Sequence, residues 1–150
     1  MKLVVQRCNS ATVTVEGEVI GRVGRGMVVL LCVLRGDGPD QAKRLAAKLA
    51  GYRFFPDKKG LMNESALDQG LGALVISQFT LAADGRRGRR PSFDQAASPE
   101  VAEPLVDHFV TCLRDEGLTV ETGCFGAHME VALVNEGPVT LQLEDLPQGT

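Results

Sequence analysis

The pattern of apolar and polar residues predicts several strands in the first quarter of the chain. Residues 2–8 begin with a short apolar run. Residues 12–15 and 19–20 flank Glu16-Gly17, a pair typical of a hairpin turn because glycine readily accepts a positive φ angle. Residues 27–34 are apolar at every position, which is typical of a central strand that is covered on both faces.

Two later segments repeat apolar residues at helical spacing. The first covers residues 40–50, with Asp40 as the expected N-cap, and the second covers residues 98–116, with Ser98 as the expected N-cap. Pro104 interrupts the second segment, and a proline inside a helix costs about 3 kcal/mol. We therefore expect this helix either to kink at Pro104 or to begin there.

The remaining strand patterns lie in the second half of the chain. Residues 71–76 form a buried strand that ends in Ser77-Gln78-Phe79-Thr80, and residues 118–122 form another. Residues 129–134 and 139–143 then alternate like the two arms of a last hairpin. These elements predict three strands after the second helix.

The segment from Asn135 to Thr140 joins those last two runs and is predicted to turn. Pro138 has a fixed φ angle and no N–H group for a strand ladder. It also restricts Gly137 to extended conformations, while the missing side chain of Gly137 lets another molecule approach the backbone closely. Taken alone, this stretch is explained by an ordinary hairpin turn.

The order of elements predicts an α/β fold with a mixed, barrel-like β-sheet in a three-layer domain and with the helices packed on one side. The order is two strands, two strand–helix units and three further strands. We see no internal repeat and no domain boundary, so residues 1–150 are expected to form one domain. Residues 144–150 have no pattern and are expected to be a frayed tail.

Composition narrows the class of protein. The 150 residues are 44% hydrophobic and 23% charged, which is the balance of a soluble globular domain. No stretch is long and apolar enough to cross a membrane, and four widely spaced cysteines fit reduced thiols in the cytoplasm. Neither His108 nor His128 has partners at ligand spacing, so we expect no metal and no cofactor.

The net charge of −3 argues against broad, sequence-independent binding of nucleic acid. The exception is a run of four arginines, Arg86, Arg87, Arg89 and Arg90, within a loop predicted over residues 82–97. Most short charged runs are simply solvated. The alternative is a phosphate clamp beside a site, because the planar guanidinium matches phosphate oxygens.

Ser77, Gln78 and Thr80 are the best candidates for chemistry. If the strand continues, Ser77 and Phe79 point to one face while Gln78 and Thr80 point to the other. Hydroxyl and amide groups can orient a substrate and stabilise an oxyanion. Thr80 can act as a nucleophile only if a base removes its proton, and no such base is visible. The alternative is an edge strand whose hydroxyls satisfy its own backbone.

These residues carry a resemblance to a known family. From Met1 to about Leu143 the chain resembles the D-aminoacyl-tRNA deacylases of the bacterial and eukaryotic type. The two most specific motifs are Ser77-Gln78-Phe79-Thr80 and Asn135-Glu136-Gly137-Pro138-Val139-Thr140. The other matching stretches are Gln6-Arg7, residues 11–15, Gly51-Tyr52-Arg53, Phe55, Arg90-Pro91-Ser92-Phe93, Ala97-Ser98-Pro99, Thr122-Gly123, Phe125-Gly126-Ala127 and Met129.

The resemblance implies a homodimer that hydrolyses the ester between a D-amino acid, or glycine wrongly attached to the tRNA for alanine, and the 3′-terminal adenosine of tRNA. It implies that the Gly137-Pro138 bond is cis and that one subunit presents it to the active site of the other. There its carbonyls would hold the substrate's α-amino group and its shape would exclude L side chains. Rejection of a mirror-image substrate requires such a rigid clash, since both esters carry the same groups.

The resemblance also implies roles for the site residues. Ser77, Gln78, Phe79 and Thr80 would surround the adenosine and the ester, with Gln78 and Thr80 as positioning residues. Phe125 and Met129 would pack against the adenine or the pocket wall, and the four arginines would contact the acceptor end. The ribose 2′-OH of the tRNA would help to activate water, while N–H groups near Phe79 and Thr80 stabilise the oxyanion.

Cys124 and Pro104 depart from the family pattern, which puts only local tRNA contacts in doubt. Two other functions remain open from the residues alone. One is a hydrolase of small esters or amides with Thr80 as its nucleophile. The other is a module that binds the RNA end without catalysis.

Overall fold

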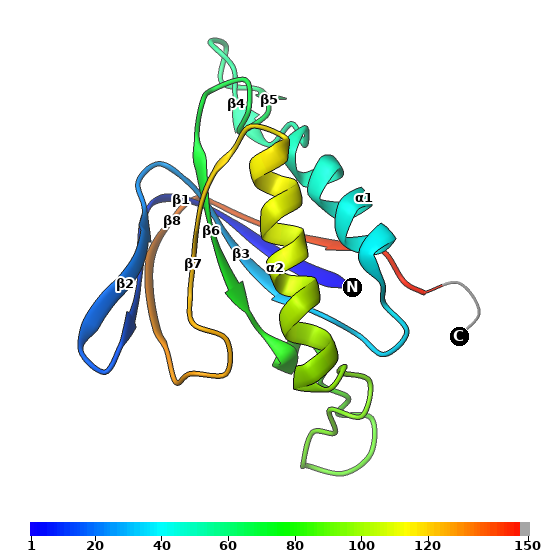
Figure 1. Ribbon diagram of the computed structural model, residues 1–150. Helices are drawn as coiled ribbons and strands as arrows, with labels where there is room; N and C mark the ends of the chain where they lie inside the picture. The colour runs from blue at the N-terminus through cyan, green and yellow to red at the C-terminus, as the bar shows by residue number, and fades with distance from the viewer. Residues whose placement is uncertain (148–150) are drawn as a thin grey trace.

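The computed structural model describes residues 1–147 and is built around a six-stranded mixed sheet (Figure 1). The strands of this sheet are β1 (Lys2–Val15), β2 (Glu18–Val23), β3 (Gly26–Cys32), β6 (Gly72–Ser77), β7 (Thr119–Thr122) and β8 (Glu130–Glu144). A separate two-stranded hairpin contains β4 (Phe55–Pro56) and β5 (Met62–Glu64). The helices are α1 (Pro39–Ala50), α2 (Pro99–Asp115) and the 3₁₀ helix η1 (Phe79–Ala82).

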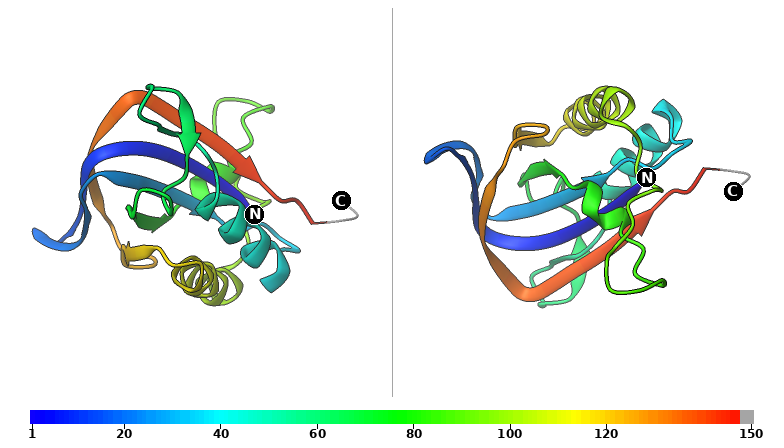
Figure 2. Two further views of the ribbon diagram at one scale, coloured as in Figure 1. Left: turned by 90° about the horizontal axis from the view of Figure 1, so that it is seen from above. Right: turned by 90° about the horizontal axis from the view of Figure 1, so that it is seen from below.

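Strand β1 holds the sheet together because it is long enough to pair with three partners. Along one edge it pairs antiparallel with β8, and along the other with β3 and then β2. Strand β6 runs parallel to β3, and β7 runs parallel to β6. The sheet curls until β2 lies against its far end, where a Cβ at Gly21 would be 2.6 Å from the carbonyl oxygen of Thr122. Figure 2 shows this curvature, which nearly closes the sheet into a barrel.

Each face of the sheet packs a separate hydrophobic cluster. Met27 and Val29 of β3 face a large cluster shared with both helices, whereas Val28 faces a smaller one inside the curl with Leu74 of β6. This alternation is the period of two expected for strands. Helices α1 and α2 lie side by side on the first face (Figure 1). The predicted α/β fold, with a barrel-like mixed sheet and helices on one side, is therefore confirmed.

The N-terminal boundary of α1 differs from the sequence prediction, whereas that of α2 agrees with it. The N-cap of α1 is Gly38 and not Asp40, and the N–H of Gly38 donates to Gln41 Oε1 over 2.9 Å. Helix α2 begins after Ser98, the expected N-cap, and continues through Pro104, so the alternative start at Pro104 is wrong. Pro104 lies on the exposed side of the second turn, so the carbonyl that loses its N–H partner can be solvated by water.

The predicted last hairpin is wrong, because both runs belong to one strand, β8. Asn135 pairs with Cys8 and Thr140 pairs with Gln6, so residues 136–139 bulge out opposite Arg7 alone. Strand β1 has 14 residues and offers an edge to both arms, so they need not pair with each other. Two strands, not three, therefore follow α2. Gly137 has a φ angle of +118°, outside the extended region that we predicted for it.

Glu144 and Asp145, near the C-terminus, are bonded to other parts of the protein. Glu144 completes β8, and the backbone N–H of Asp145 donates to the carbonyl of Met1 over 3.0 Å. The Asp145 carboxylate lies 2.6 Å from Nε of Arg44. Glu144 and Asp145, which we expected to belong to a frayed tail, are therefore bonded to the body of the protein, and residues 148–150 lie outside the described part of the chain. Within residues 1–147, no helix is long and apolar enough to span a membrane.

Candidate active site

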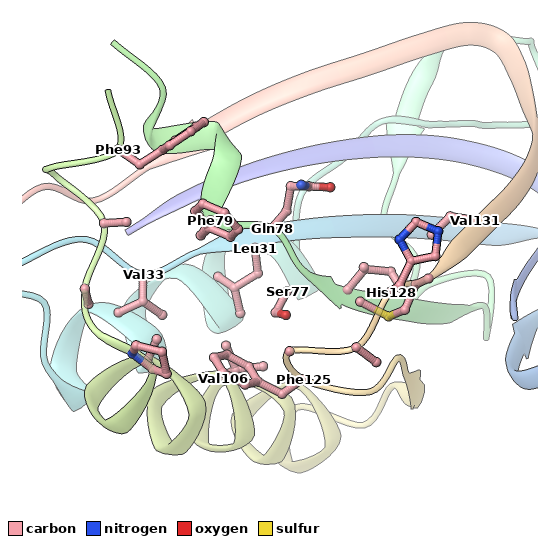
Figure 3. Close-up of a pocket in the computed structure, with 18 residues that line it drawn as sticks. Leu31, Val33, Ser77, Gln78, Phe79, Phe93, Val106, Phe125, His128 and Val131 are labelled. Carbon is pink, nitrogen blue, oxygen red and sulfur yellow. The ribbon is translucent and has the colours of Figure 1, made fainter. Parts of the chain in front are cut away.

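A cavity of about 590 Å³ opens where β3 and β6 end, between α2 and residues 125–131 (Figure 3). Its walls are mostly apolar, with Leu31 and Val33 at the base and Val106 of α2 on one side. Three polar side chains also line it: Ser77, Gln78 and His128. A volume of this size, with few polar groups in an apolar wall, is typical of a site for a small molecule or a terminal nucleoside.

Ser77 and Gln78 reach the cavity because β6 ends there. Ser77 pairs with Leu31 as the last residue of the strand, and the N–H of Gln78 donates to the Leu31 carbonyl over 2.7 Å. The chain then turns into η1. The predicted strand alternation is therefore wrong beyond Ser77, and Ser77, Gln78 and Phe79 all line the same cavity.

Thr80 lies beside this cavity and does not line it. Its side chain is exposed, and its Oγ1 accepts a hydrogen bond from Nε2 of Gln78 over 2.5 Å. A nucleophilic hydroxyl needs a neighbouring base, whereas the partner of Thr80 is a neutral amide donor. This contact is consistent with a role for Thr80 in orienting the Gln78 side chain.

Aromatic side chains stand on opposite walls of the cavity. Phe79 is 58% exposed and meets Phe93 edge to face, with ring centroids 5.2 Å apart. Phe125 and Met129 line the far wall. A Cβ at Gly123 would be 2.6 Å from Sδ of Met129, so glycine is needed for the methionine to pack there. The structure brings together five of the predicted residues: Ser77, Gln78, Phe79, Phe125 and Met129.

His128 is a cavity residue that the sequence analysis considered only as a metal ligand. Figure 3 shows its ring beside Val131. Its place in the matching stretch between Ala127 and Met129 was the signal that pointed to it. Within residues 1–147, no three histidine, cysteine, aspartate or glutamate side chains are grouped to hold a metal ion.

The four arginines do not line this cavity. They lie on an exposed loop that is closed by two backbone hydrogen bonds between Asp84 and Ser92. Arg86 donates through Nε and one terminal nitrogen to both carboxylate oxygens of Asp84. These hydrogen bonds hold the pKa of the Asp84 carboxyl at about 2. The loop projects from the end of the sheet at which β3 and β6 finish (Figure 1).

The Gly137-Pro138 bulge is exposed and does not line the cavity of its own chain. Its peptide bond is cis, as the family resemblance implied. Asn135 stabilises the bulge from inside, because its side-chain amide donates to the carbonyls of Arg7 and Val139, both over 3.0 Å.

Arg7 supports the bulge from below and was noted in the sequence only as part of a matching stretch. Its terminal nitrogen donates to the Phe54 carbonyl over 2.7 Å, and its Nε lies 2.5 Å from Oε2 of Glu136. The Nε–H does not point at that oxygen, so this contact is an ion pair without a hydrogen bond. Arg7 is only 7% exposed, and it fixes one side of the bulge against the body of the protein.

Comparison with known proteins gives consistent matches. The family model described as D-Tyr-tRNA(Tyr) deacylase matches residues 4–144. The chain is 52% identical to a D-aminoacyl-tRNA deacylase from Halorhodospira halophila, over 99% of this chain and 97% of the relative. It is 56% identical to one from Roseiflexus sp. (strain RS-1), over 96% and 93% of the two chains.

Two solved structures resemble the fold. One is a c-Myc DNA unwinding element binding protein, with a TM-score of 0.91 and 38% identity over 97% of this chain and 99% of the other. The second is described as a probable eukaryotic D-amino acid tRNA deacylase. It has a TM-score of 0.82 and 17% identity over 95% and 97% of the two chains, so it supports the fold alone.

Proposed function

The chain belongs to the D-aminoacyl-tRNA deacylase family, and from this premise we propose that the cavity beside Ser77, Gln78 and Phe79 is where it hydrolyses its substrate. The enzyme is a hydrolase that cleaves the ester of D-aminoacyl-tRNA and releases the D-amino acid and the tRNA. The observation that carries the proposed site is the meeting of the two family stretches, residues 77–79 and 125–129, around one cavity.

The cavity suits the 3′-terminal adenosine. The base would lie against its apolar walls, with Phe79 and Phe125 on opposite sides (Figure 3). Met129 also lines this cavity. Flat aromatic and sulfur-containing side chains are favourable neighbours for a nucleobase. Ser77 and Gln78 would then be the polar groups near the ribose and the ester, where they position the reacting atoms.

The chemistry proposed for the ester uses backbone groups and the substrate itself. The N–H groups of Phe79 and Thr80 are the first two of η1, so they lack partners within that helix. Pointed at the ester carbonyl, they would stabilise the oxyanion that forms when water attacks. The ribose 2′-OH of the tRNA would assist the water, which removes the need for a protein base and for a cofactor.

We propose that the working enzyme is a homodimer in which Gly137-Pro138 of one subunit enters the cavity of the other. The bulge is exposed and lies outside its own cavity, which supports a role across subunits. Its carbonyls would hold the α-amino group, so an L side chain would meet rigid backbone while a D side chain or glycine would not. The four arginines would contact the acceptor end. Four free cysteines are consistent with action in the reducing cytoplasm.

The first test compares hydrolysis of D-tyrosyl-tRNA and L-tyrosyl-tRNA by the purified protein. We expect rapid loss of the D ester alone, because the two esters differ only in the direction of the side chain. Release of tyrosine is measured over time against the spontaneous rate. Equal rates for both esters would contradict chiral selection, and binding of tRNA without turnover would favour the RNA-end-binding module instead.

Thr80→Ala separates the proposed mechanism from a threonine nucleophile. We expect the variant to remain active, with kcat lowered by about tenfold or less, since only the hydrogen bond that orients Gln78 is lost. Single-turnover hydrolysis of D-tyrosyl-tRNA measures this effect. Complete loss of activity, together with a trapped acyl-enzyme in the wild type, would instead establish Thr80 as the nucleophile. Thr111→Ala on α2 is the matched control.

A further inference from the structure

A second cavity, of about 440 Å³, lies on the outer side of the wall that bounds the proposed active site. Lys2 of β1, Arg35 and Arg86 contribute its positive charges, and Asp84 and Glu144 contribute its negative ones. Neither Lys2 nor Arg35 belongs to the short motifs that carry the family resemblance, and the reaction proposed above uses neither side chain.

The two cavities share their dividing wall. Val33 lines the active-site cavity, while Leu34 and Arg35, the next two residues, line the second cavity. Residues 95 and 96 divide between the two cavities in the same way. Ala96 lines the active-site cavity, and Gln95 lines the second cavity. The N–H of Arg35 donates to the Gln95 carbonyl over 2.9 Å and so fixes this part of the wall.

Helix η1 spans the distance between the two cavities. Its first residue, Phe79, lines the active site, and its last, Ala82, lines the second cavity. A 3₁₀ helix rises about 2 Å per residue, so these two ends are about 6 Å apart. An RNA strand with its last nucleoside in the active site therefore needs only a short path over η1 to bring a backbone phosphate to the second cavity.

The positive groups at this cavity keep N–H groups that are not used in ion pairs. Asp84 binds Arg86 through Nε and one terminal nitrogen, which leaves the N–H groups on the other terminal nitrogen free. Asp84, whose pKa these hydrogen bonds lower to about 2, stays ionised throughout the neutral range and so remains a partner for the guanidinium. Within residues 1–147, neither Lys2 nor Arg35 forms an ion pair.

We propose that this second cavity binds a backbone phosphate of the tRNA acceptor end, with Arg35 and Lys2 as its principal ligands and Arg86 held ready by Asp84. The inference rests on the proposed function, since it assumes that the 3′ end occupies the neighbouring cavity. It explains how a protein with a net charge of −3 holds RNA, because the basic groups gather beside the site and not over the whole surface.

The test uses the double variant Lys2→Gln/Arg35→Gln on two substrates. One is D-tyrosyl-tRNA, and the other is 3′-O-D-tyrosyl-adenosine, which has no phosphate. We expect KM for the tRNA to rise about tenfold or more, because each lost contact is a charge-assisted hydrogen bond. The variant's kcat on the tRNA and its kinetics on the adenosine ester should stay within about twofold of wild type. The slope of log KM against log salt concentration should fall by about 1 to 2.

The matched control is Lys58→Gln/Lys59→Gln in the exposed β4–β5 turn, which removes the same charge from residues that line neither cavity. An unchanged KM for tRNA in the double variant, an equal rise in the control, or an equal loss on the adenosine ester would each overturn the inference.

A binding experiment tests the phosphate site separately from the proposed function. Binding of uncharged tRNA to the wild type and to the double variant is measured by fluorescence anisotropy. Suppose that the wild type hydrolyses neither ester, while it binds uncharged tRNA more tightly than the double variant does. The proposed function would then be wrong, and the proposed phosphate site would still be supported.

Discussion

Gly137→Ala should lower kcat/KM for D-tyrosyl-tRNA about 100-fold, the loss expected when a positioning group moves by about 1 Å. The φ angle of +118° at Gly137 is one that L residues rarely adopt. A Cβ there would also lie 2.8 Å from Cγ2 of Val139 and 3.1 Å from a terminal nitrogen of Arg7. The bulge must therefore shift, and its carbonyls would leave the position in which we propose that they hold the α-amino group.

The ratio of D to L hydrolysis should fall as well, because the surface that we propose rejects L side chains moves with the bulge. Both rates are measured with matched tyrosyl-tRNAs. Gly24→Ala is the control, since its Cβ would meet nothing within 4 Å and its φ angle is not in the positive range. A Gly137→Ala enzyme with wild-type rates and selectivity would show that the bulge does not touch the substrate.

A mixing experiment tests whether the bulge acts across subunits. Gly137→Ala is co-expressed with Ser77→Phe, which fills the cavity but keeps the bulge. In a two-fold dimer with random pairing, half of the dimers are mixed and each has one complete site, so about a quarter of the wild-type activity should return. If the bulge serves its own chain, no complete site forms and activity stays at the level of the separate variants.

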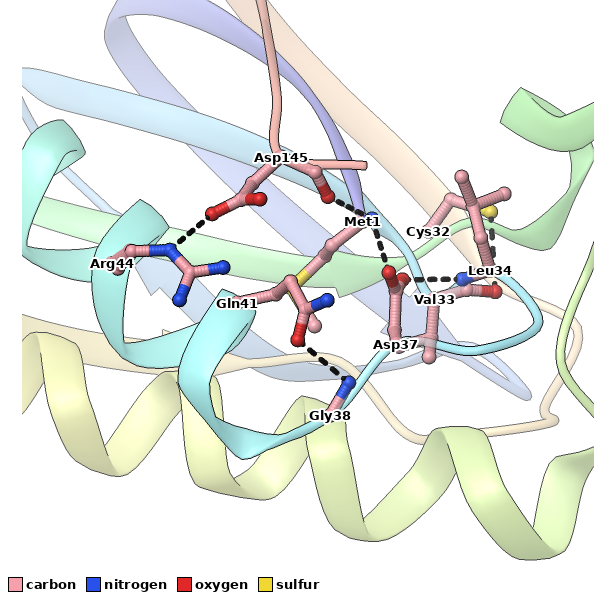
Figure 4. Close-up of polar contacts among 9 residues, drawn as sticks. All are labelled: Met1, Cys32, Val33, Leu34, Asp37, Gly38, Gln41, Arg44 and Asp145. Atoms are coloured by element: carbon pink, nitrogen blue, oxygen red, sulfur yellow. Dashed lines mark hydrogen bonds and ion pairs between the residues drawn. The ribbon is translucent and has the colours of Figure 1, made fainter. Parts of the chain in front are cut away.

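Asp37→Asn should lower the free energy of unfolding by about 3 kcal/mol, a cost typical of breaking a buried ion pair. The Asp37 carboxylate and the Met1 ammonium group are fully buried and 2.7 Å apart (Figure 4). The second carboxylate oxygen accepts the Leu34 N–H, also over 2.7 Å. Asparagine has one acceptor oxygen in place of two, so one of these donors must lose its partner.

Urea unfolding followed by circular dichroism measures this loss, and the melting temperature should fall by about 6–12 °C. The control is Asp107→Asn on the exposed side of α2, which should stay within about 0.5 kcal/mol of wild type. Equal stability of the two variants would show that the pair between Met1 and Asp37 contributes nothing net. Folded Asp37→Asn protein should keep its kcat, because the pair lies outside both cavities.

The sequence by itself determined the elements whose causes are local. The hairpin at Glu16-Gly17 follows from one pair of turn residues, and both have positive φ angles in the structure. The helix over residues 40–50 is recognised from the helical spacing of its apolar residues, and β3 is recognised because its residues are apolar on both faces of the strand. The two motifs also placed the chain in its family, because the spacing between specific residues is visible in the sequence alone.

Only the tertiary structure decided which strands pair and which side chains meet. Residues 129–134 and 139–143 have the alternation of a hairpin, but β1 offers both of them a longer edge, so they form one strand with a bulge. Whether a strand pairs with its neighbour or with a distant partner depends on register and competing edges, which local pattern does not contain. The contacts of Arg7 with Phe54 and of Met1 with Asp37 join residues 47 and 36 positions apart. Such contacts exist only after the chain has folded. For that reason the contacts that support the bulge, and the second cavity, were not visible in the sequence.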